Sequence, residues 1–383
     1  MKLNYFNFKQ YGKSILMTND FGKYMFVSKE DFGKILSLDV DRESELYESL
    51  IEKKMIYDES DLEYSSINKY ALREIKGHVN VATSLHIFVV TTVCNMSCIY
   101  CQANNGVECS HLIMNKEMAE KAVDIALQSP EESLCFEFQG GEPLVNFDII
   151  KHIVQYAEIH KEKHEIAYTV VTNLTLLNDE MLDFFVQYNF GISTSVDGSE
   201  LVHNNNRPYA DGSGTFKKVI NSVERVRKAG LQVGAIETST RFSLNFPKEI
   251  VHAYVEMGFE SIFIRPLTPL GKAAKSWEKI GYSSEEFIKF YQQALDELIE
   301  INKAGRFIKE DHAAILLRRI RGDFMNYMEL RSPCGAGVGQ LAYYADGNIF
   351  TCDEGRMLHE MGQSTFQLGN VYNNTYTDLI NNS

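Results

Sequence analysis

The sequence predicts an α/β protein: a partial (β/α)6 TIM-like barrel with a small N-terminal winged-helix-like domain and a C-terminal hairpin region. Three observations lead to this prediction. Six short runs rich in β-branched and aromatic residues alternate with longer amphipathic stretches, a pattern typical of parallel strands joined by helical crossovers. Near the N-terminus, two apolar runs flank the turn signal Asn19-Asp20-Phe21-Gly22, which indicates a hairpin. With 383 residues, 44% of them hydrophobic, the chain is long enough for one large domain and one or two smaller ones.

The N-terminal domain is expected to span residues 1–75. After the hairpin, Ser28 with Asp31 resembles a capping box at the start of a helix, and a second helical pattern follows. This order of elements is a small winged-helix pattern. The polar stretch 59–69 is mostly free of periodicity and is predicted to be a linker to the barrel.

The barrel is expected to span residues 80–305. In parallel β/α barrels the active site lies at the C-terminal ends of the strands, so the residues directly after each run are the first to consider. Polar and glycine-rich residues follow these runs, which predicts a site at this mouth of the barrel. The six predicted strands are 85–92, 134–139, 167–172, 191–196, 232–238 and 261–266.

The C-terminal region is expected to span residues 306–383. An apolar run interrupted by Asp346-Gly347 predicts two strands joined by a tight turn. Cys334 and Cys352 bracket this hairpin.

Composition and charge narrow the classes of function. A net charge of -14 opposes general attraction to nucleic-acid phosphates or anionic lipid, so neither nucleic acid nor membrane is an expected partner. No apolar run approaches the length that spans a bilayer, and the N-terminus lacks the apolar core of a secretory signal, which predicts a cytoplasmic protein. Seven clustered cysteines in such a chain favour metal ligands over a disulfide framework.

The most informative motif is a C-x3-C-x2-C loop, made of Cys94, Cys98 and Cys101, directly after the first predicted strand. Three thiolates on one short loop can hold three irons of a 4Fe-4S cluster and leave the fourth iron open for chemistry. A zinc site or simply buried thiols are the alternatives. Zinc knuckles usually pair two C-x2-C halves, and here Cys109 would have to serve as a loosely spaced fourth ligand.

With Tyr100 as the aromatic residue, this C-x3-C-x-aromatic-C loop resembles the motif of the radical S-adenosylmethionine (SAM) enzymes. The resemblance implies two cofactors, a 4Fe-4S cluster and SAM, and a reductant such as flavodoxin or ferredoxin. It further implies that the open iron binds the amino and carboxylate groups of SAM. One electron from the cluster would then cleave SAM to methionine and a 5'-deoxyadenosyl radical, which removes a hydrogen atom from the substrate.

The resemblance also assigns residues to the SAM site. Glycines in the second family motif let the backbone approach the cofactor, its carboxylate accepts from the SAM ammonium group, and an arginine after strand four meets the SAM carboxylate. An ordinary strand-to-helix turn and strand-end capping are the structural alternatives. The cofactor-binding residues that the resemblance implies are Tyr100, Gly140, Gly141, Glu142, Pro143, Thr172, Asn173, Ser195, Asp197 and Arg207. No catalytic acid or base is identified.

Cys334, twelve residues, Gly347, four residues and Cys352 resemble the opening of the SPASM or twitch extension, which carries auxiliary iron-sulfur clusters. This implies that Cys334 and Cys352 are ligands of an auxiliary 4Fe-4S cluster. The family pattern continues with further cysteines, but none follows Cys352 here. Truncation is therefore the expectation, and a site that is absent or completed by other groups is the alternative.

Taken over almost its whole length, the chain resembles the radical SAM peptide maturases of His-Xaa-Ser systems. The resemblance implies hydrogen abstraction from a ribosomally synthesised peptide or protein and its post-translational modification. Residues 1–75 resemble the peptide-recognition domain of such maturases, which adds a leader peptide as a strand to a sheet edge, and a structural accessory domain is the alternative. Two alternatives stay open: oxidation of Ser or Cys in a protein, as in anaerobic sulfatase maturation, and a zinc-dependent winged-helix regulator.

Overall fold

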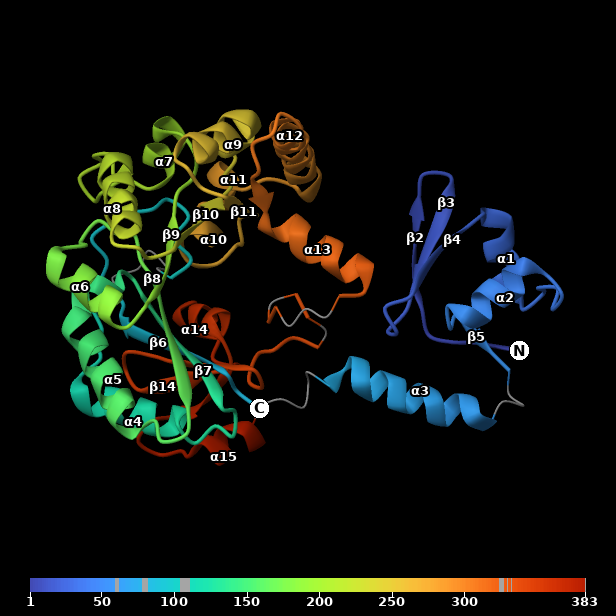
Figure 1. The fold of residues 1–383 in the computed structure, drawn as a ribbon, viewed down its shortest axis with the longest axis horizontal. Helices are drawn as coiled ribbons and strands as arrows, with labels where there is room; N and C mark the ends of the chain where they lie inside the picture. Colours follow the sequence, from blue (N-terminus) through green and yellow to red (C-terminus); the bar gives the residue numbers. More distant parts are fainter. Residues whose placement is uncertain are drawn as a thin grey trace. The chain divides into compact units, whose positions relative to one another are not determined.

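The computed structural model describes residues 1–58, 62–77, 82–103, 111–323, 327–328, 330–331 and 333–382, with the backbone alone for 62–68. The chain divides into two compact units. The first consists of Met1–Val81 with Ile315–Asn326, and the second of Ala82–Ala314 with Tyr327–Ser383. Figure 1 shows the helices and strands of both units.

The first unit is built on a small antiparallel sheet with the strand order β2-β3-β4. The predicted hairpin is present as β3 and β4, and β2 adds a third strand at the edge. A two-stranded pair, β1 with β5, ties the start of the unit to the end of its second helix. The elements are β1 (Lys2–Leu3), β2 (Asn7–Tyr11), β3 (Ser14–Thr18), β4 (Tyr24–Val27), α1 (Lys29–Ser37), α2 (Glu45–Glu52), β5 (Ile56–Tyr57) and α3 (Leu62–Ile75).

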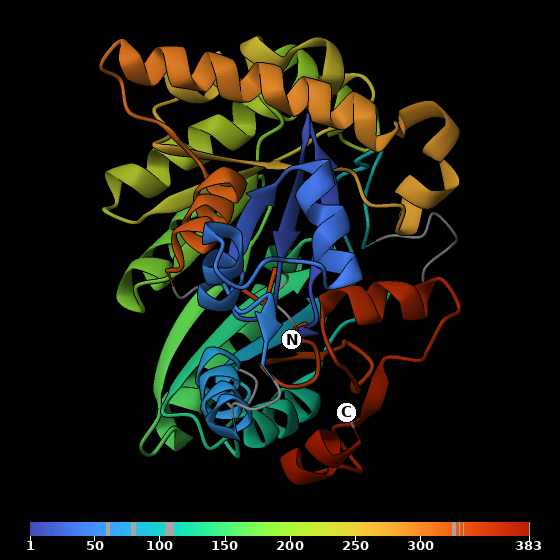
Figure 2. The ribbon, with the colours of Figure 1, turned by 90° about the vertical axis from the view of Figure 1, so that its right-hand side faces the viewer.

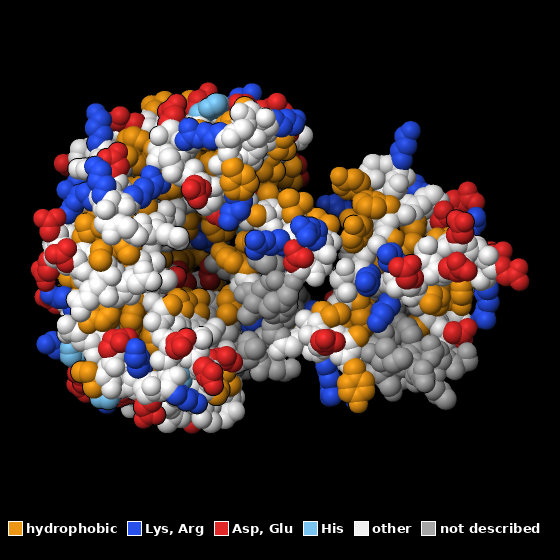
Figure 3. Space-filling model, in the orientation of Figure 1, with side chains coloured by type: hydrophobic (Ala, Val, Ile, Leu, Met, Phe, Trp, Pro, Cys, Tyr) orange, Lys and Arg blue, Asp and Glu red, His pale blue; other side chains and the backbone are white. Residues whose placement is uncertain are grey.

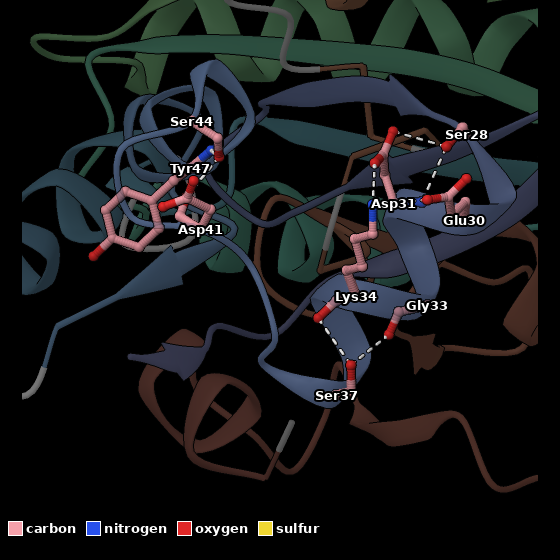
Figure 4. A network of polar contacts seen from close by, with 9 residues as sticks. All are labelled: Ser28, Glu30, Asp31, Gly33, Lys34, Ser37, Asp41, Ser44 and Tyr47. Atoms are coloured by element: carbon pink, nitrogen blue, oxygen red, sulfur yellow. Dashed lines mark hydrogen bonds and ion pairs between the residues drawn. The ribbon is translucent and has the colours of Figure 1, made fainter.

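Serine caps start both short helices of this unit (Figure 4). The Ser28 hydroxyl accepts from the Asp31 amide at α1, and Ser44 does the same for the Tyr47 amide at α2. Such caps are worth about 1 kcal/mol each. One side of the sheet and the helices share a core that contains Met17, Ile35 and Leu50, among others.

The predicted linker at 59–69 is helical over most of its length, because α3 begins at Leu62. Residues 62–75 contain neither glycine nor proline and are rich in Leu, Glu, Lys, Ala and Arg, which favour a helix. Hydrophobic periodicity alone therefore missed a helix that intrinsic propensity supports.

The second unit contains the six predicted parallel strands, and the α/β barrel-like class is confirmed. The strand order is β12-β11-β10-β9-β8-β7-β6-β13-β14-β15. The strands are β6 (Leu85–Thr91), β7 (Ser133–Gly140), β8 (Glu165–Val171), β9 (Gly191–Ser195), β10 (Val233–Thr238), β11 (Ser261–Arg265), β12 (Lys309–Glu310), β13 (Gln340–Tyr343), β14 (Asn348–Phe350) and β15 (Gln367–Asn370).

Helices cover the outer face of this sheet, and Figure 2 shows α12 at full length in that layer. The helices that follow β6 in the chain are α4 (Lys116–Ala126), α5 (Phe147–His160), α6 (Asp179–Gln187), α7 (Glu200–Asn206), α8 (Phe216–Lys228), α9 (Pro247–Glu256), α10 (Gly271–Lys275), α11 (Trp277–Ile280), α12 (Ser284–Lys303), α13 (Asp311–Arg321), α14 (Asp353–Glu360) and α15 (Tyr376–Asn381), with short 3-10 turns at Pro143–Asn146 and Ser243–Asn245. Most of α13 belongs to the first unit.

The alternation along β7 shows how the sheet divides its two faces. Leu134, Phe136 and Phe138 are buried in the main core, whereas Cys135 and Glu137 on the other face are half-buried. This is the period of two that a pleated strand imposes. The polar face of the strand is therefore available to line the inside of the barrel.

The predicted C-terminal hairpin is present, but it does not stand apart from the barrel. β13 pairs in parallel with β6, and β14 and β15 continue the same sheet in antiparallel fashion. Tyr376 of α15 also returns to the start of β6, where its hydroxyl accepts from the Thr83 amide at 3.1 Å. The C-terminal region thus extends the sheet beyond its first strand.

The surface of the barrel unit in the view of Figure 3 carries acidic and basic side chains interspersed. Among the described residues, no helix combines the length and the apolar character that crossing a membrane requires.

Candidate active site

The cysteine loop leaves the C-terminal end of β6 and is held by backbone bonds to a distant segment. The Ser97 amide donates to the Pro208 carbonyl and the Ile99 amide to the Asn206 carbonyl, both at 2.9 Å. Within the loop, the Met96 amide donates to Cys94 Sγ at 3.4 Å. The loop is therefore fastened to the turn that carries Arg207.

All three thiols of the loop are half-buried and free of disulfide bonds. Burial raises the pKa of Cys94 to about 12 and that of Cys98 to about 11, while Arg207 and Lys272 favour the Cys98 thiolate. Thiols in this setting become thiolates when a metal binds them. Among the described residues, no three His, Cys, Asp or Glu side chains converge as the ligands of one metal ion.

The Gly140-Gly141-Glu142-Pro143 turn after β7 packs tightly on the start of the cysteine loop. A Cβ on Gly141 would lie 2.5 Å from the Thr92 carbonyl oxygen and 2.6 Å from that of Val93. The Gly141 and Glu142 amides donate to the Thr91 and Val93 carbonyls at 2.9 and 2.8 Å. The glycines allow this turn to approach the backbone of the cysteine loop. The motif predicted glycines for another purpose, the approach of the backbone to a cofactor.

Glu142 is fully buried and joins this turn to the end of β8. Its Oε1 accepts from the Thr172 hydroxyl at 2.6 Å and from the Leu144 amide at 3.0 Å, and its Oε2 accepts from the Asn173 amide at 2.7 Å. Burial raises the pKa of Glu142 above its ordinary value, and these three donors act against that rise. Pro143 follows as the first residue of a 3-10 turn.

Asn173 connects the same cluster to the first cysteine. Its Nδ2 donates to Asn95 Oδ1 at 3.0 Å and points at Cys94 Sγ, 4.0 Å away. Asn95 in turn donates to the Thr175 hydroxyl at 2.8 Å. The second and third strand ends are therefore linked through side chains to the cysteine loop.

A second buried network joins Tyr100, Asp197 and Arg207. The Tyr100 hydroxyl lies 2.9 Å from both carboxylate oxygens of Asp197 and accepts from Arg207 Nη1 at 2.7 Å. Burial raises the pKa of Asp197 to about 6 against the opposing effect of the Arg207 charge. Arg207 Nε is buried without a hydrogen-bond partner among the described residues. An unpaired buried donor of this kind costs about 1–3 kcal/mol, which a bound acceptor would recover.

The remaining predicted site residues lie outside these networks. Ser195 ends β9 and is half-buried on the strand face opposite the main core. Cys352 is buried at the N-terminus of α14, where its Sγ accepts from the Gly355 amide at 3.3 Å. Cys334 is exposed. Within the described residues, the structure shows no contact between Cys334 and Cys352.

Two further cysteines complete the set of seven. Cys135 is half-buried, with its Sγ 3.7 Å from the Thr169 hydroxyl on the polar strand face. Cys109 lies outside the described residues.

Sequence reasoning missed three residues that meet the cysteine loop. Asn95 occupies a variable position of the motif and carried no signal of its own. The Lys272 amide donates to the Cys101 carbonyl at 2.9 Å, and Cys101 is among the groups that raise the pKa of Arg356. The position of Lys272 shortly after the sixth strand could have indicated it, because that is where barrel sites lie.

The fold and the loop define a class: an iron-sulfur enzyme with a parallel α/β barrel-like core. Residues 88–259 match the Radical SAM superfamily. An uncharacterized protein of Methanocaldococcus jannaschii is 30% identical over 221 residues, which cover 58% of this chain and 71% of that protein. A cysteine-type anaerobic sulfatase-maturating enzyme of Clostridium novyi is 22% identical over 307 residues, which cover 78% of this chain and 79% of that enzyme.

Solved structures share the fold. The anSMEcpe protein with bound AdoMet superposes with a TM-score of 0.66 at 24% identity, covering 78% of this chain and 79% of that one. SuiB of Streptococcus suis, bound to its precursor peptide SuiA, gives a TM-score of 0.56 at 14% identity, covering 99% of this chain and 87% of that one.

The chain belongs to the radical SAM superfamily. It is therefore an iron-sulfur enzyme whose cofactors are a 4Fe-4S cluster and SAM. The alternative of a zinc-dependent winged-helix regulator is wrong, because the family match covers the segment that carries the cysteine loop.

Proposed function

We propose that this enzyme is a maturase that modifies a ribosomally synthesised peptide or protein by hydrogen abstraction. The observation that carries the proposal is the cysteine loop fastened to the Tyr100, Asp197 and Arg207 network at the mouth of the barrel. When bound, the cluster and SAM supply a 5'-deoxyadenosyl radical that can take a hydrogen atom from a carbon of the substrate. The peptide class is supported by maturases among the similar proteins, whose substrates are a protein and a precursor peptide.

Cys94, Cys98 and Cys101 are the proposed ligands of the 4Fe-4S cluster. In such a cluster each thiolate binds a different iron, so the three sulfurs need not converge on one point. The structure agrees with this arrangement. Cys98 and Cys101 contribute to the raised pKa of Cys94, yet among the described residues the side chains do not converge as the ligands of a single ion. The residues present therefore fit a cluster with one iron that the protein does not bind.

Arg207 and Glu142 are the proposed anchors for the two charged groups of SAM. The Arg207 guanidinium is held by Tyr100 through Nη1 and keeps a buried Nε free for an acceptor, which suits a carboxylate. Among the described residues, Glu142 Oε2 receives one donor, so a lone pair is left to accept from an ammonium group. We assign Tyr100, Gly140, Gly141, Pro143, Thr172, Asn173, Ser195 and Asp197 to the wall of the same site.

The first unit is proposed to recruit the substrate. β2 is an edge strand whose five residues are all exposed, and β4 forms the other edge of the sheet. An extended peptide can add to such an edge through backbone hydrogen bonds. The fold shared with SuiB covers 99% of this chain, so it includes this unit.

Cys334 and Cys352 are proposed as ligands of an auxiliary cluster. Cys352 sits at a helix N-terminus, where the helix dipole favours its thiolate. Further ligands would have to come from groups other than the cysteines of the first loop.

A sulfatase-type maturase is the second candidate. The Clostridium novyi enzyme aligns over 79% of its own length, which supports oxidation of Ser or Cys as strongly as crosslinking. The two reactions differ in their products, because oxidation yields an aldehyde whereas a crosslink does not.

The first experiment tests the radical SAM chemistry of this chain. Protein reconstituted without oxygen is expected to show a charge-transfer absorbance and, with a reductant, to release 5'-deoxyadenosine from SAM. A triple variant with Ala at Cys94, Cys98 and Cys101 should lose both signals, whereas Cys135→Ala is the matched control that keeps them. A cluster-loaded wild type that releases no nucleoside would overturn the proposal.

The second experiment identifies the product. The enzyme is incubated with the peptide encoded beside its gene and, separately, with a sulfatase peptide that carries Cys or Ser, and both are analysed by mass spectrometry. Loss of two hydrogens without carbonyl reactivity supports a crosslink, and an aldehyde captured by a hydrazine supports the sulfatase type. Modification of neither peptide contradicts both assignments.

A further inference from the structure

Arg356 is a buried cation that the proposed reaction has not used. It lies on α14 with 2% of its surface exposed and is one of the largest fully buried side chains. Its Nε donates to Asp353 Oδ1 at 2.6 Å, which pairs the two charges within α14. A buried ion pair of this kind is a weak source of stability, because the loss of hydration opposes the attraction. Its burial therefore calls for a reason other than folding.

The position of α14 brings Arg356 to the cysteine loop. α14 contacts α10, and the Gly271 amide at the start of α10 donates to Met361 Sδ at 3.3 Å, just after α14 ends. The next amide of α10, that of Lys272, donates to the Cys101 carbonyl at 2.9 Å. α14 is thus one segment removed from the last cysteine of the loop, within one compact unit.

The electrostatic interactions of Arg356 agree with this position of α14 near the cysteine loop. Tyr344 and Cys101 are among the groups that raise the pKa of Arg356, whereas Arg207 and Lys272 lower the pKa of Cys98. Cations from three separate segments are therefore coupled electrostatically to the loop. Arg356 is the one that comes from the C-terminal region, and guanidinium stays charged at every relevant pH.

We propose that Arg356 is a positioning residue that raises the reduction potential of the cluster held by Cys94, Cys98 and Cys101. This inference rests on the proposed function, because it needs those ligands. A fixed positive charge stabilises the form of the cluster with one more electron, and net charge around a cluster is one of the factors that set its potential. Asp353, which pairs with Arg356, acts in the opposite direction and moderates the effect.

The test is a redox titration of the reconstituted cluster, followed by the electron paramagnetic resonance signal of its reduced form. Arg356→Met keeps the length of the side chain and removes its charge. We expect the equilibrium constant for one-electron reduction to fall about tenfold, which is about 59 mV. Asp353→Asn should shift the potential upward, and Arg356→Lys should keep most of the wild-type value.

Arg225→Met is the matched control, since Arg225 pairs with Asp179 on the outer helical layer. Its potential should equal that of the wild type. Iron and sulfide contents are measured for every variant. If Arg356→Met does not take up the cluster, the inference is tested by the reduction potential of Asp353→Asn, which should be higher than that of the wild type.

Unchanged potentials in cluster-loaded Arg356→Met and Asp353→Asn would overturn the inference and leave the proposed function intact. A wild type that binds no cluster would overturn the proposed function and this inference with it. Opposite shifts in the two variants support the inference, because general damage to the site would move both in one direction.

Discussion

Gly141→Ala tests whether the turn after β7 supports the cysteine loop through backbone contact. The added Cβ would lie 2.5 Å from the Thr92 carbonyl oxygen, about 0.9 Å short of the 3.4 Å at which ordinary contact begins. Relief of this overlap costs about 1–3 kcal/mol, and each backbone hydrogen bond lost in the process adds about 1 kcal/mol. We therefore expect the free energy of unfolding to fall by about 2–4 kcal/mol.

Gly234→Ala is the control for this substitution. Gly234 lies in β10, and a Cβ there would meet nothing within 4 Å. Removing a strand glycine should leave stability unchanged or raise it by about 0.5–1 kcal/mol. Both variants are unfolded in urea without oxygen, and their iron content after reconstitution is compared. A Gly141→Ala protein as stable and as rich in iron as Gly234→Ala would refute the reasoning.

Three further predictions concern the buried polar groups and the core of the first unit. Tyr100→Phe removes the hydroxyl that both oxygens of Asp197 share, so it should lower stability by about 1.5–3 kcal/mol and weaken SAM binding in calorimetry. A Tyr100→Phe protein with the stability and the SAM affinity of the wild type would contradict the role of this hydrogen-bond network. Burial lowers the pKa of His86 and of His203 to about 3, so the folded state binds fewer protons than the unfolded state below pH 6.5. Stability should fall by about 1 kcal/mol for each histidine between pH 6.5 and 5.5 in urea titrations, and a His86→Phe variant that keeps the full slope would contradict this. Leu50→Ala leaves a cavity in the first unit and should destabilise it by about 2–5 kcal/mol, which would be seen as faster proteolysis of that unit. A variant as resistant to protease as the wild type would contradict this, because it would mean that neighbouring side chains fill the cavity.

The strands of the barrel were predictable because their signal is local. The runs predicted at 85–92, 191–196 and 261–266 differ from β6, β9 and β11 by a single residue at one end. Each run is short, apolar or β-branched, and bounded by turn residues, so the information lies within the segment itself. The cysteine loop was equally local, since its spacing is complete within eight residues.

The links between segments were not predictable. Tyr100 and Asp197 were each assigned to the SAM site, but their hydrogen bond joins residues 97 positions apart. The pairing of β13 with β6 depends on which strand edge is free once the barrel forms, and no local pattern encodes that. The position of Arg356 follows from the same long-range packing, because α14 reaches the cysteine loop only through its contact with α10.

The parallel pairing of β13 with β6 also has a consequence for how the protein is made. Gln340 pairs with Leu85, so the strand that precedes the cysteine loop has an open edge until 255 further residues have been synthesised. Contacts this distant in sequence form slowly, and an unpaired apolar edge invites association with other chains. Expression should therefore yield more intact protein when translation is slowed or chaperones are abundant. Iron-sulfur assembly should follow synthesis of β13 rather than accompany synthesis of the loop, because only then is the base of the site complete.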